Sequence, residues 1–142
     1  MKKVTIITGF CLLFGCCFIA CSKNSSGSGG GGGSTPVIEE NLLIGVDPDP
    51  GSAVASSLSA TYDFKTTIKS KMPSAGIKID MLCTKDADNS AVSSQTLSGS
   101  SSSVNMSVTG LLPGVLCTVK ITVTSVSKPS NTATLSFKVA RK

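Results

Sequence analysis

The sequence predicts an all-β domain over residues 36–142, built as a sandwich of antiparallel strands. Apolar and polar residues alternate repeatedly in this region, which is the pattern of a strand with one buried face. No part of the region shows the 3.6-residue apolar spacing of a helix. Polar clusters containing Gly or Pro separate the alternating segments at intervals typical of sandwiches. The 107 residues are enough for one hydrophobic core.

Seven strands are expected, each from its own alternation. In residues 117–123 four apolar side chains alternate with three polar ones, and residues 133–139 repeat this pattern. Residues 127–131, which separate these two segments, have the composition of a hairpin loop. Residues 92–97 show the weakest alternation. In chain order the expected strands are residues 42–46, 62–68, 77–83, 92–97, 104–108, 117–123 and 133–139.

The first 20 residues are expected to be a signal peptide. Lys2 and Lys3 form a short cationic start, and residues 4–20 are an apolar run of 17 residues, at the short edge of a membrane-spanning helix. Lysine before the run and small residues after it favour a cleaved signal. A signal-anchor helix that is never cleaved is the alternative.

The apolar run ends in Phe18-Ile19-Ala20-Cys21, which resembles the lipobox of bacterial lipoproteins. The resemblance implies attachment of a lipid to the Cys21 thiol and cleavage after Ala20, so that Cys21 becomes the first residue of the mature protein. Phe18 departs from the Leu that is usual in this family. Cys16, preceded by Leu13-Phe14-Gly15, is a competing lipidation site, but cleavage there would leave residues 17–20 as apolar mature sequence.

A lipidated Cys21 implies a membrane partner and a place in the bacterial cell envelope. A single acyl chain binds a membrane only marginally, whereas the three chains of bacterial lipoproteins hold a protein there permanently. Ser22, rather than Asp, follows Cys21. This resembles envelope lipoproteins that are sorted to the outer membrane, so the outer membrane is the expected address. Whether the domain lies on the periplasmic or the surface side is left open.

Residues 22–35 are expected to be a flexible linker. They contain five consecutive glycines, at positions 29–33, together with several serines. Fourteen residues of this composition have a typical reach of about 20 Å. The linker therefore separates the lipidated Cys21 from the domain that starts at residue 36.

The composition argues against an enzyme and against a nucleic-acid partner. The chain has no His, which removes the commonest general base and the usual partner of Ser and Cys nucleophiles. Loss of Lys2 and Lys3 with the signal lowers the formal net charge from +5 to +3, too small and scattered a charge for nucleic-acid binding. No catalytic residue, metal site or other cofactor site is therefore predicted.

Three segments were weighed as sites and are interpreted as loops. Residues 86–89, Asp-Ala-Asp-Asn, carry calcium-type ligands, but Ala91 and Leu97 stand where an EF-hand needs Gly and Glu, so a turn is favoured. Residues 47–51, Asp-Pro-Asp-Pro-Gly, indicate a rigid turn. The serine run at residues 100–103 has no activating base and is expected to be a solvated loop.

Residues 111–119, Leu-Leu-Pro-Gly-Val-Leu-Cys-Thr-Val, resemble the corner before strand F of fibronectin type III domains. The family pattern is L-x-P-G-x-x-Y-T-V, and residues 131–137 resemble its F–G region. The resemblance covers about 40 residues and implies a seven-stranded antiparallel sandwich of the immunoglobulin-like type. Cys117 replaces the tyrosine of the family's corner.

In such a sandwich Cys83 and Cys117 would lie on neighbouring strands, and we expect a disulfide between them. They are the two cysteines that remain after the signal and Cys21 are set aside. The predicted register places Cys83 opposite Cys117 and Met81 opposite Val119. The bridge would close a loop of about 35 residues and stabilise the fold by roughly 3.8 kcal/mol. Two buried free thiols are the alternative; a redox-active pair is disfavoured because both residues point inward.

The sequence therefore predicts a membrane-anchored, non-catalytic binding or adhesion module whose loops meet a protein or a glycan. The ligand is not identified by any motif. The alternative is a structural accessory subunit of a larger envelope assembly that pairs through an edge strand.

Overall fold

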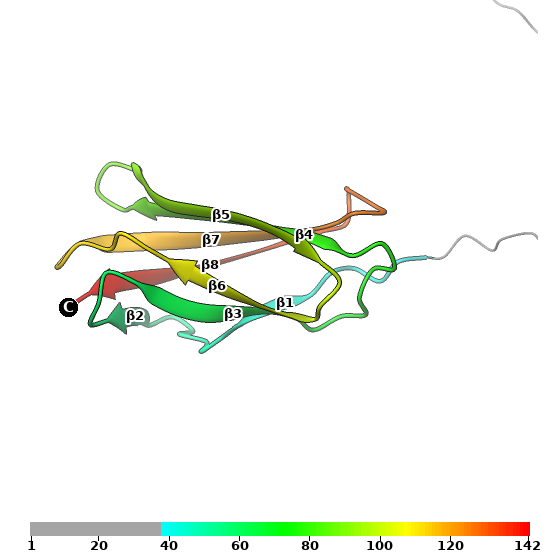
Figure 1. Ribbon diagram of the computed structural model, residues 1–142, viewed down its shortest axis with the longest axis horizontal. Coiled ribbons are helices and arrows are strands. Elements are labelled where there is room, and N and C mark those ends of the chain that lie inside the picture. Colours follow the sequence, from blue (N-terminus) through cyan, green and yellow to red (C-terminus); the bar gives the residue numbers. More distant parts are fainter. Residues whose placement is uncertain (1–37) are drawn as a thin grey trace, which may run out of the picture. The chain divides into compact units, whose positions relative to one another are not determined.

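The computed structural model describes residues 38–142, and within this range every regular element is a strand. The predicted signal peptide, Cys21, Cys16 and the linker all lie outside the described residues. The strands form two sheets that face each other across one core, in agreement with the predicted all-β sandwich (Figure 1). The part of the chain that the structure describes contains no helix able to cross a membrane.

The two sheets differ in size. The three-stranded sheet has the order β1-β3-β6, with β1 at Ile44–Asp47, β3 at Tyr62–Ile68 and β6 at Ser103–Val108. The five-stranded sheet has the order β2-β8-β7-β4-β5. Its strands are β2 (Val54–Ser57), β8 (Thr132–Arg141), β7 (Leu116–Ser125), β4 (Ile77–Lys85) and β5 (Ala91–Gly99).

The structure has eight strands in residues 38–142, one more than expected, and one pair is parallel. The additional strand is β2, which pairs in parallel with β8, so that Ala55 lies beside Val139. Its sequence, Val-Ala-Ser-Ser, is short and sits between loop-like residues. Alternation over four residues is too weak to predict a strand, and β2 exists because β8 offers it a free edge.

The crossing from β1 to β2 moves the chain from one sheet to the other. It passes through residues 47–51, the segment predicted as a rigid turn. The Asp47-Pro48 peptide bond is cis. The Gly51 amide donates to Asp49 Oδ1 at 2.9 Å, and the Ala53 amide donates to the Pro50 carbonyl at 2.9 Å. The turn prediction is confirmed for this segment.

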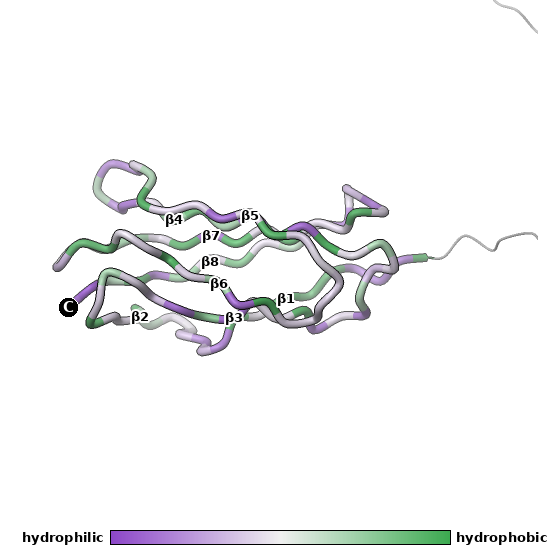
Figure 2. Tube along the Cα trace, in the orientation of Figure 1, coloured by the Kyte–Doolittle hydropathy of each residue, from purple (hydrophilic) through white to green (hydrophobic). Residues whose placement is uncertain are grey.

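The core lies between the inner faces of the two sheets. Hydrophobic and hydrophilic residues alternate along β4 and β7 (Figure 2). Along β7, every second residue from Cys117 to Ser125 is buried. An aromatic cluster joins the sheets, because Phe64 of β3 meets Phe137 of β8 edge to face, with ring centroids 5.4 Å apart. Tyr62 stacks beside Phe64 at 6.1 Å.

The register between β4 and β7 differs by two residues from the predicted one. Cys83 lies opposite Val119, and Lys85 lies opposite Cys117, so the predicted register, with Cys83 directly opposite Cys117, is wrong. Both strands are longer than expected, since β4 continues to Lys85 and β7 starts at Leu116. A shift of two residues keeps every side chain on the same face, so the alternation alone does not distinguish these two registers.

Asn131 fastens the N-terminal end of the described chain to the β7–β8 loop. Its side chain accepts from the Leu42 amide at 2.9 Å and donates to the Glu40 carbonyl at 2.9 Å and to Glu39 Oε2 at 3.1 Å. Asn131 is buried. The Ser125 hydroxyl donates to Glu39 as well, at 3.0 Å. The chain therefore enters the domain at the end that carries the β7–β8 loop.

We predict that Asn131→Ala lowers the free energy of unfolding by about 1–3 kcal/mol, because it leaves the Leu42 amide and the Glu40 carbonyl without their buried partner. Urea denaturation of the domain measures the loss. Ser130→Ala, in the same loop but exposed, is the control and should leave the midpoint unchanged. Equal midpoints for Asn131→Ala and the wild type would contradict the role of Asn131.

Candidate functional site: the C-terminal pole

The sandwich has two ends, which differ in what they hold. The N-terminal pole comprises residues 38–42, the β3–β4 loop and the β7–β8 loop. Asn131 joins the β7–β8 loop to residues 39–42, and the Val126 amide joins it to the β3–β4 loop by donating to the Gly76 carbonyl at 3.1 Å. The C-terminal pole comprises the loops at residues 58–61, 86–90 and 109–115 together with Lys142. Figure 1 shows the C-terminus at this second end, beside β2.

Backbone hydrogen bonds tie the loops of the C-terminal pole to one another. The Leu111 amide donates to the Ala60 carbonyl at 3.0 Å, which joins the β6–β7 loop to the β2–β3 loop. The Asp86 amide donates to the Leu116 carbonyl at 3.0 Å. The Gly114 amide donates to the Arg141 carbonyl at 2.9 Å, and the Lys142 amide donates to the Ser57 carbonyl at 2.9 Å. The pole is thus one connected surface, and little ordering is needed before it binds.

Three leucines expose their side chains on this pole. Leu58 is 87% exposed, Leu112 is 52% exposed and Leu116 is 39% exposed. They come from two loops and the first residue of β7, and the hydrogen bonds above hold these segments together. Leu111, the neighbour of Leu112 in the sequence, is fully buried. Exposed leucines on connected segments at one end of a small domain make that end a candidate protein-binding surface.

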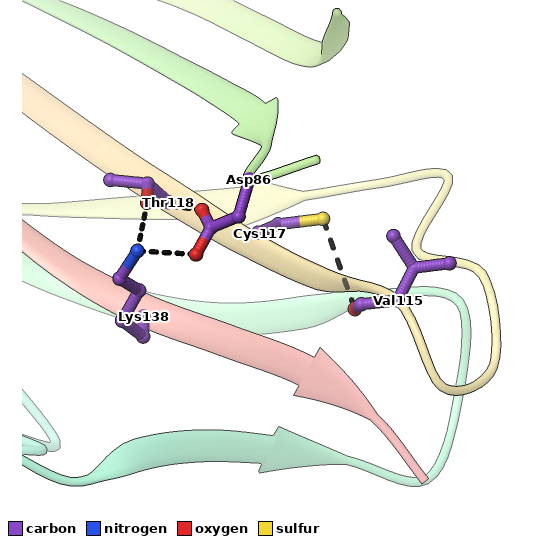
Figure 3. Close-up of polar contacts among 5 residues, drawn as sticks. All are labelled: Asp86, Val115, Cys117, Thr118 and Lys138. Carbon is purple, nitrogen blue, oxygen red and sulfur yellow. Dashed lines mark hydrogen bonds and ion pairs between the residues drawn. The ribbon is translucent and has the colours of Figure 1, made fainter. Parts of the chain in front are cut away.

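A polar cluster lies beside the pole, on the outer face of the five-stranded sheet (Figure 3). The Thr118 hydroxyl donates to Asp86 Oδ1 at 2.6 Å, and Lys138 Nζ donates to the Thr118 hydroxyl at 2.9 Å. Lys138 also forms an ion pair with Asp86 Oδ2. The pKa of Asp86 is lowered, chiefly by the hydrogen bond from Lys138 and next by the hydrogen bond from Thr118.

This cluster stabilises the β4–β5 turn and has no catalytic arrangement. Asp86 starts the turn, and its partners stand on β7 and β8, so the three side chains join three segments of the chain. The lowered pKa keeps Asp86 ionised, which disfavours a role as general acid or base near neutral pH. The rest of the turn is held by Asp88, whose Oδ1 accepts from the Ser90 amide at 2.9 Å, and by Asn89 at φ 57°. The turn predicted for residues 86–89 is therefore confirmed.

We predict that the stability conferred by Asp86 depends on pH. Its pKa is lower in the folded protein than the ordinary value of about 3.9, so the carboxylate stabilises the fold above that value. The contribution is lost as the pH falls through the folded pKa. Urea midpoints of wild type and Asp86→Asn should differ at pH 7 and converge as the pH falls through the lowered pKa of Asp86. Parallel curves at all pH values would contradict this role for Asp86.

Cys83 and Cys117 are both fully buried, and the structure holds them as free thiols. Their sulfurs are neighbours: the pKa of Cys83 is raised to about 12, chiefly by burial and next by Cys117. In the observed register the pair is diagonal across β4 and β7, whereas the prediction placed them directly opposite. Cys117 Sγ lies 4.0 Å from the Val115 carbonyl (Figure 3). The disulfide remains a prediction, with buried thiols as the alternative.

We predict that neither cysteine of the folded domain reacts with iodoacetamide at pH 8, because burial excludes the reagent and the high pKa of Cys83 removes its thiolate. Mass spectrometry of the intact domain reads the result. Alkylation after unfolding in guanidinium, without reductant, then separates the two states: blocked thiols indicate the bridge, and two alkylated thiols exclude it. Rapid alkylation of the native domain would contradict the buried environment.

The hollows on the described surface are small or shallow. Two of them, of about 120 and 180 Å³, are below the usual size of a ligand pocket. A third, of about 430 Å³, lies open on the outer side of β3 and β6 beside Asp47, Lys65 and Asn105. Among the described residues there is no group of three or more His, Cys, Asp or Glu that could hold a metal ion.

Sequence reasoning did not identify the leucines of the C-terminal pole. Leu111 and Leu112 are identical residues in adjacent positions, and only the tertiary structure shows that one is buried and the other exposed. Leu58 lies between the short strand β2, which the sequence did not predict, and the predicted strand at residues 62–68. An apolar residue in an otherwise polar loop is the signal that would have singled out Leu58.

The chain matches no model of a known protein family and no curated protein.

Proposed function

We propose that this protein is a lipid-anchored, non-catalytic binding or adhesion module. The lipobox at Cys21 and the linker at residues 22–35 supply the tether, and the sandwich supplies the binding surface. The observation that carries the proposal is the exposure of Leu58, Leu112 and Leu116 at the pole away from the point where the chain enters the domain. The chain enters the domain at the N-terminal pole, so the rigid C-terminal pole with its exposed leucines is the end that a tethered domain presents.

The order of the strands supports an immunoglobulin-like or fibronectin type III-like sandwich. In that fold one sheet contains strands A, B and E, and the other contains strands G, F and C, extended by C′ in some members. β1, β3 and β6 have the order A-B-E, while β8, β7, β4 and β5 have the order G-F-C-C′. β2 adds a second half of strand A on the edge of β8. The proposed strand F starts beside Cys117, after Pro113 and Gly114.

The chemistry of the C-terminal pole favours a protein ligand. Leu58, Leu112 and Leu116 offer apolar contacts, and Lys142 adds a positive charge at the edge. Interfaces between proteins combine an apolar centre with a polar rim in this way. A glycan is the other ligand class that the proposal includes.

The proposal predicts that binding depends on the C-terminal pole. Leu58→Asp with Leu112→Asp should abolish retention of the ligand, because both changes place a charge in the apolar centre of the surface. The measurement is recovery of bound proteins from envelope extracts on immobilised domain, together with binding to a glycan array. Val126→Asp, at the N-terminal pole and 54% exposed, is the matched control and should bind as the wild type does.

Unchanged binding by the Leu58/Leu112 variant would exclude the C-terminal pole as the binding surface. The second candidate function is that of a structural accessory subunit of a larger envelope assembly. It would be supported if every preparation, including that of the control variant, recovered a fixed set of partners in stoichiometric amounts. The observation in its favour is the long unpaired edge of β5, at the side of the five-stranded sheet.

A further inference from the structure

The two sheets end in four edge strands, and three of these are protected. β1 and β2 are only four residues long, and the crossing between them carries Pro48 and Pro50. Short strands, prolines and charges are the devices by which proteins prevent edge pairing. β6 is covered in part from the facing sheet, since Gln95 Oε1 accepts from the Ser107 amide and Ser93 Oγ accepts from the Thr109 amide, both at 3.4 Å.

β5 is the fourth edge and has none of these three protections; its irregularity is a β-bulge at its start, where Ser93 lies opposite Cys83 but Ala91 lies opposite Thr84. It is nine residues long, contains no proline and pairs with β4 on one side only. Not one charged residue occurs in residues 89–119, which include all of β5 and β6. Figure 2 shows pale colours over most of β5, since four of its nine residues are Ser or Thr. Such an edge presents free backbone amides and carbonyls to another strand.

We propose that β5 is a homodimerisation edge: two copies of this chain pair their β5 strands antiparallel and join their five-stranded sheets into one. A second copy suits this edge because an antiparallel pairing about Gln95 sets hydroxyl side chains of β5 opposite each other and brings no charges together. The chain has a net positive charge, which opposes self-association over most of its surface. The charge-free side formed by β5 is where two copies meet without that repulsion.

A two-fold axis at Gln95, the central residue of β5, gives a register without conflicts. Ser94 then lies opposite Thr96 of the second copy, and Ser93 lies opposite its Leu97. Hydroxyl side chains in opposed positions form favourable cross-strand pairs. Ser94 and Thr96 stand on the outer face of the sheet, opposite Leu82 and Asp80 of β4, and Asp80 already accepts a hydrogen bond from Thr96 at 2.7 Å. No like charges are brought together.

Cross-linking in the full chain tests the pairing. Gln95→Cys places the new thiols of two copies directly opposite each other at the two-fold axis. Two forms of the variant with different epitope tags are expressed together, oxidised in isolated membranes and separated without reductant. The expected product is a dimer that contains both tags. Ser56→Cys, exposed on the protected edge strand β2, and the unmodified chain are the controls and should remain at background.

A charge-pair experiment separates dimerisation from damage to the fold. In the proposed register Ser94 and its copy are diagonal neighbours on the outer face of the joined sheet. Ser94→Lys and Ser94→Glu, each added to Gln95→Cys, should lower the cross-linked yield about fivefold through like-charge repulsion. Coexpression of the Lys and Glu forms should restore the cross-linked yield, because the opposite charges attract. If either variant were unfolded, coexpression would not restore the yield.

Absence of a two-tag dimer, or cross-linking of Gln95→Cys only to a different protein, would overturn the homodimer. Failure of the Lys and Glu forms to complement each other would overturn the register. The pairing does not rest on the binding function of the C-terminal pole: Leu58→Asp with Leu112→Asp should lose its ligand and still give the dimer. Loss of ligand binding is therefore distinguishable from loss of dimerisation.

Discussion

The fold depends on the buried inner face of β7. This strand lies between β4 and β8 at the centre of the five-stranded sheet, and its inward side chains are inaccessible to solvent from end to end. Val119, Ile121 and Val123 fill the middle of the core, and each buried side chain of this size stabilises the fold by about 1.5–3 kcal/mol. The strand also fixes the positions of both poles, because its first residue belongs to one and its last leads into the loop of the other.

Each end of β7 is held by a different kind of contact. At its start, Thr118 on the outer face joins Asp86 and Lys138, and the Leu116 carbonyl accepts from the Asp86 amide. At its end, Ser125 turns inward and donates to Glu39, beside the buried Asn131. Charged and polar side chains therefore position the loops, whereas apolar packing and the backbone pairing with β4 and β8 hold the centre. Because the loops and the core are held by different contacts, the residues of the loops can change without disturbing the core.

The side edges of the sandwich have unequal roles. On one side the chain crosses between the sheets through Pro48 and Pro50, and short strands close both edges. On the other side β5 and β6 are long, uncharged and joined by a few side-chain hydrogen bonds. A domain that only needed to remain monomeric would gain from charges on β5. Their absence over residues 89–119 is the physical basis for assigning an association surface to this side.

The sequence by itself determined which residues point inward. The two-residue period of a strand is local, so Ile77, Ile79, Val119 and Ile121 could be placed on the core faces from their alternation, and the turns at residues 47–51 and 86–89 from their Asp, Asn, Pro and Gly content. The all-β class and most of the strands followed from this. Cys21 and the linker are predicted from motifs of the same local kind and lie outside the described residues.

Tertiary structure decided what local pattern leaves open. A shift of two residues preserves every inward position, so only the packing of whole strands placed Cys83 opposite Val119 rather than Cys117. β2 forms because β8 has a free edge, Asn131 is buried because the chain returns over its loop, and Leu112 is exposed while Leu111 is not. Each of these depends on contacts between distant parts of the chain. For that reason the candidate binding pole could not be identified before the fold was known.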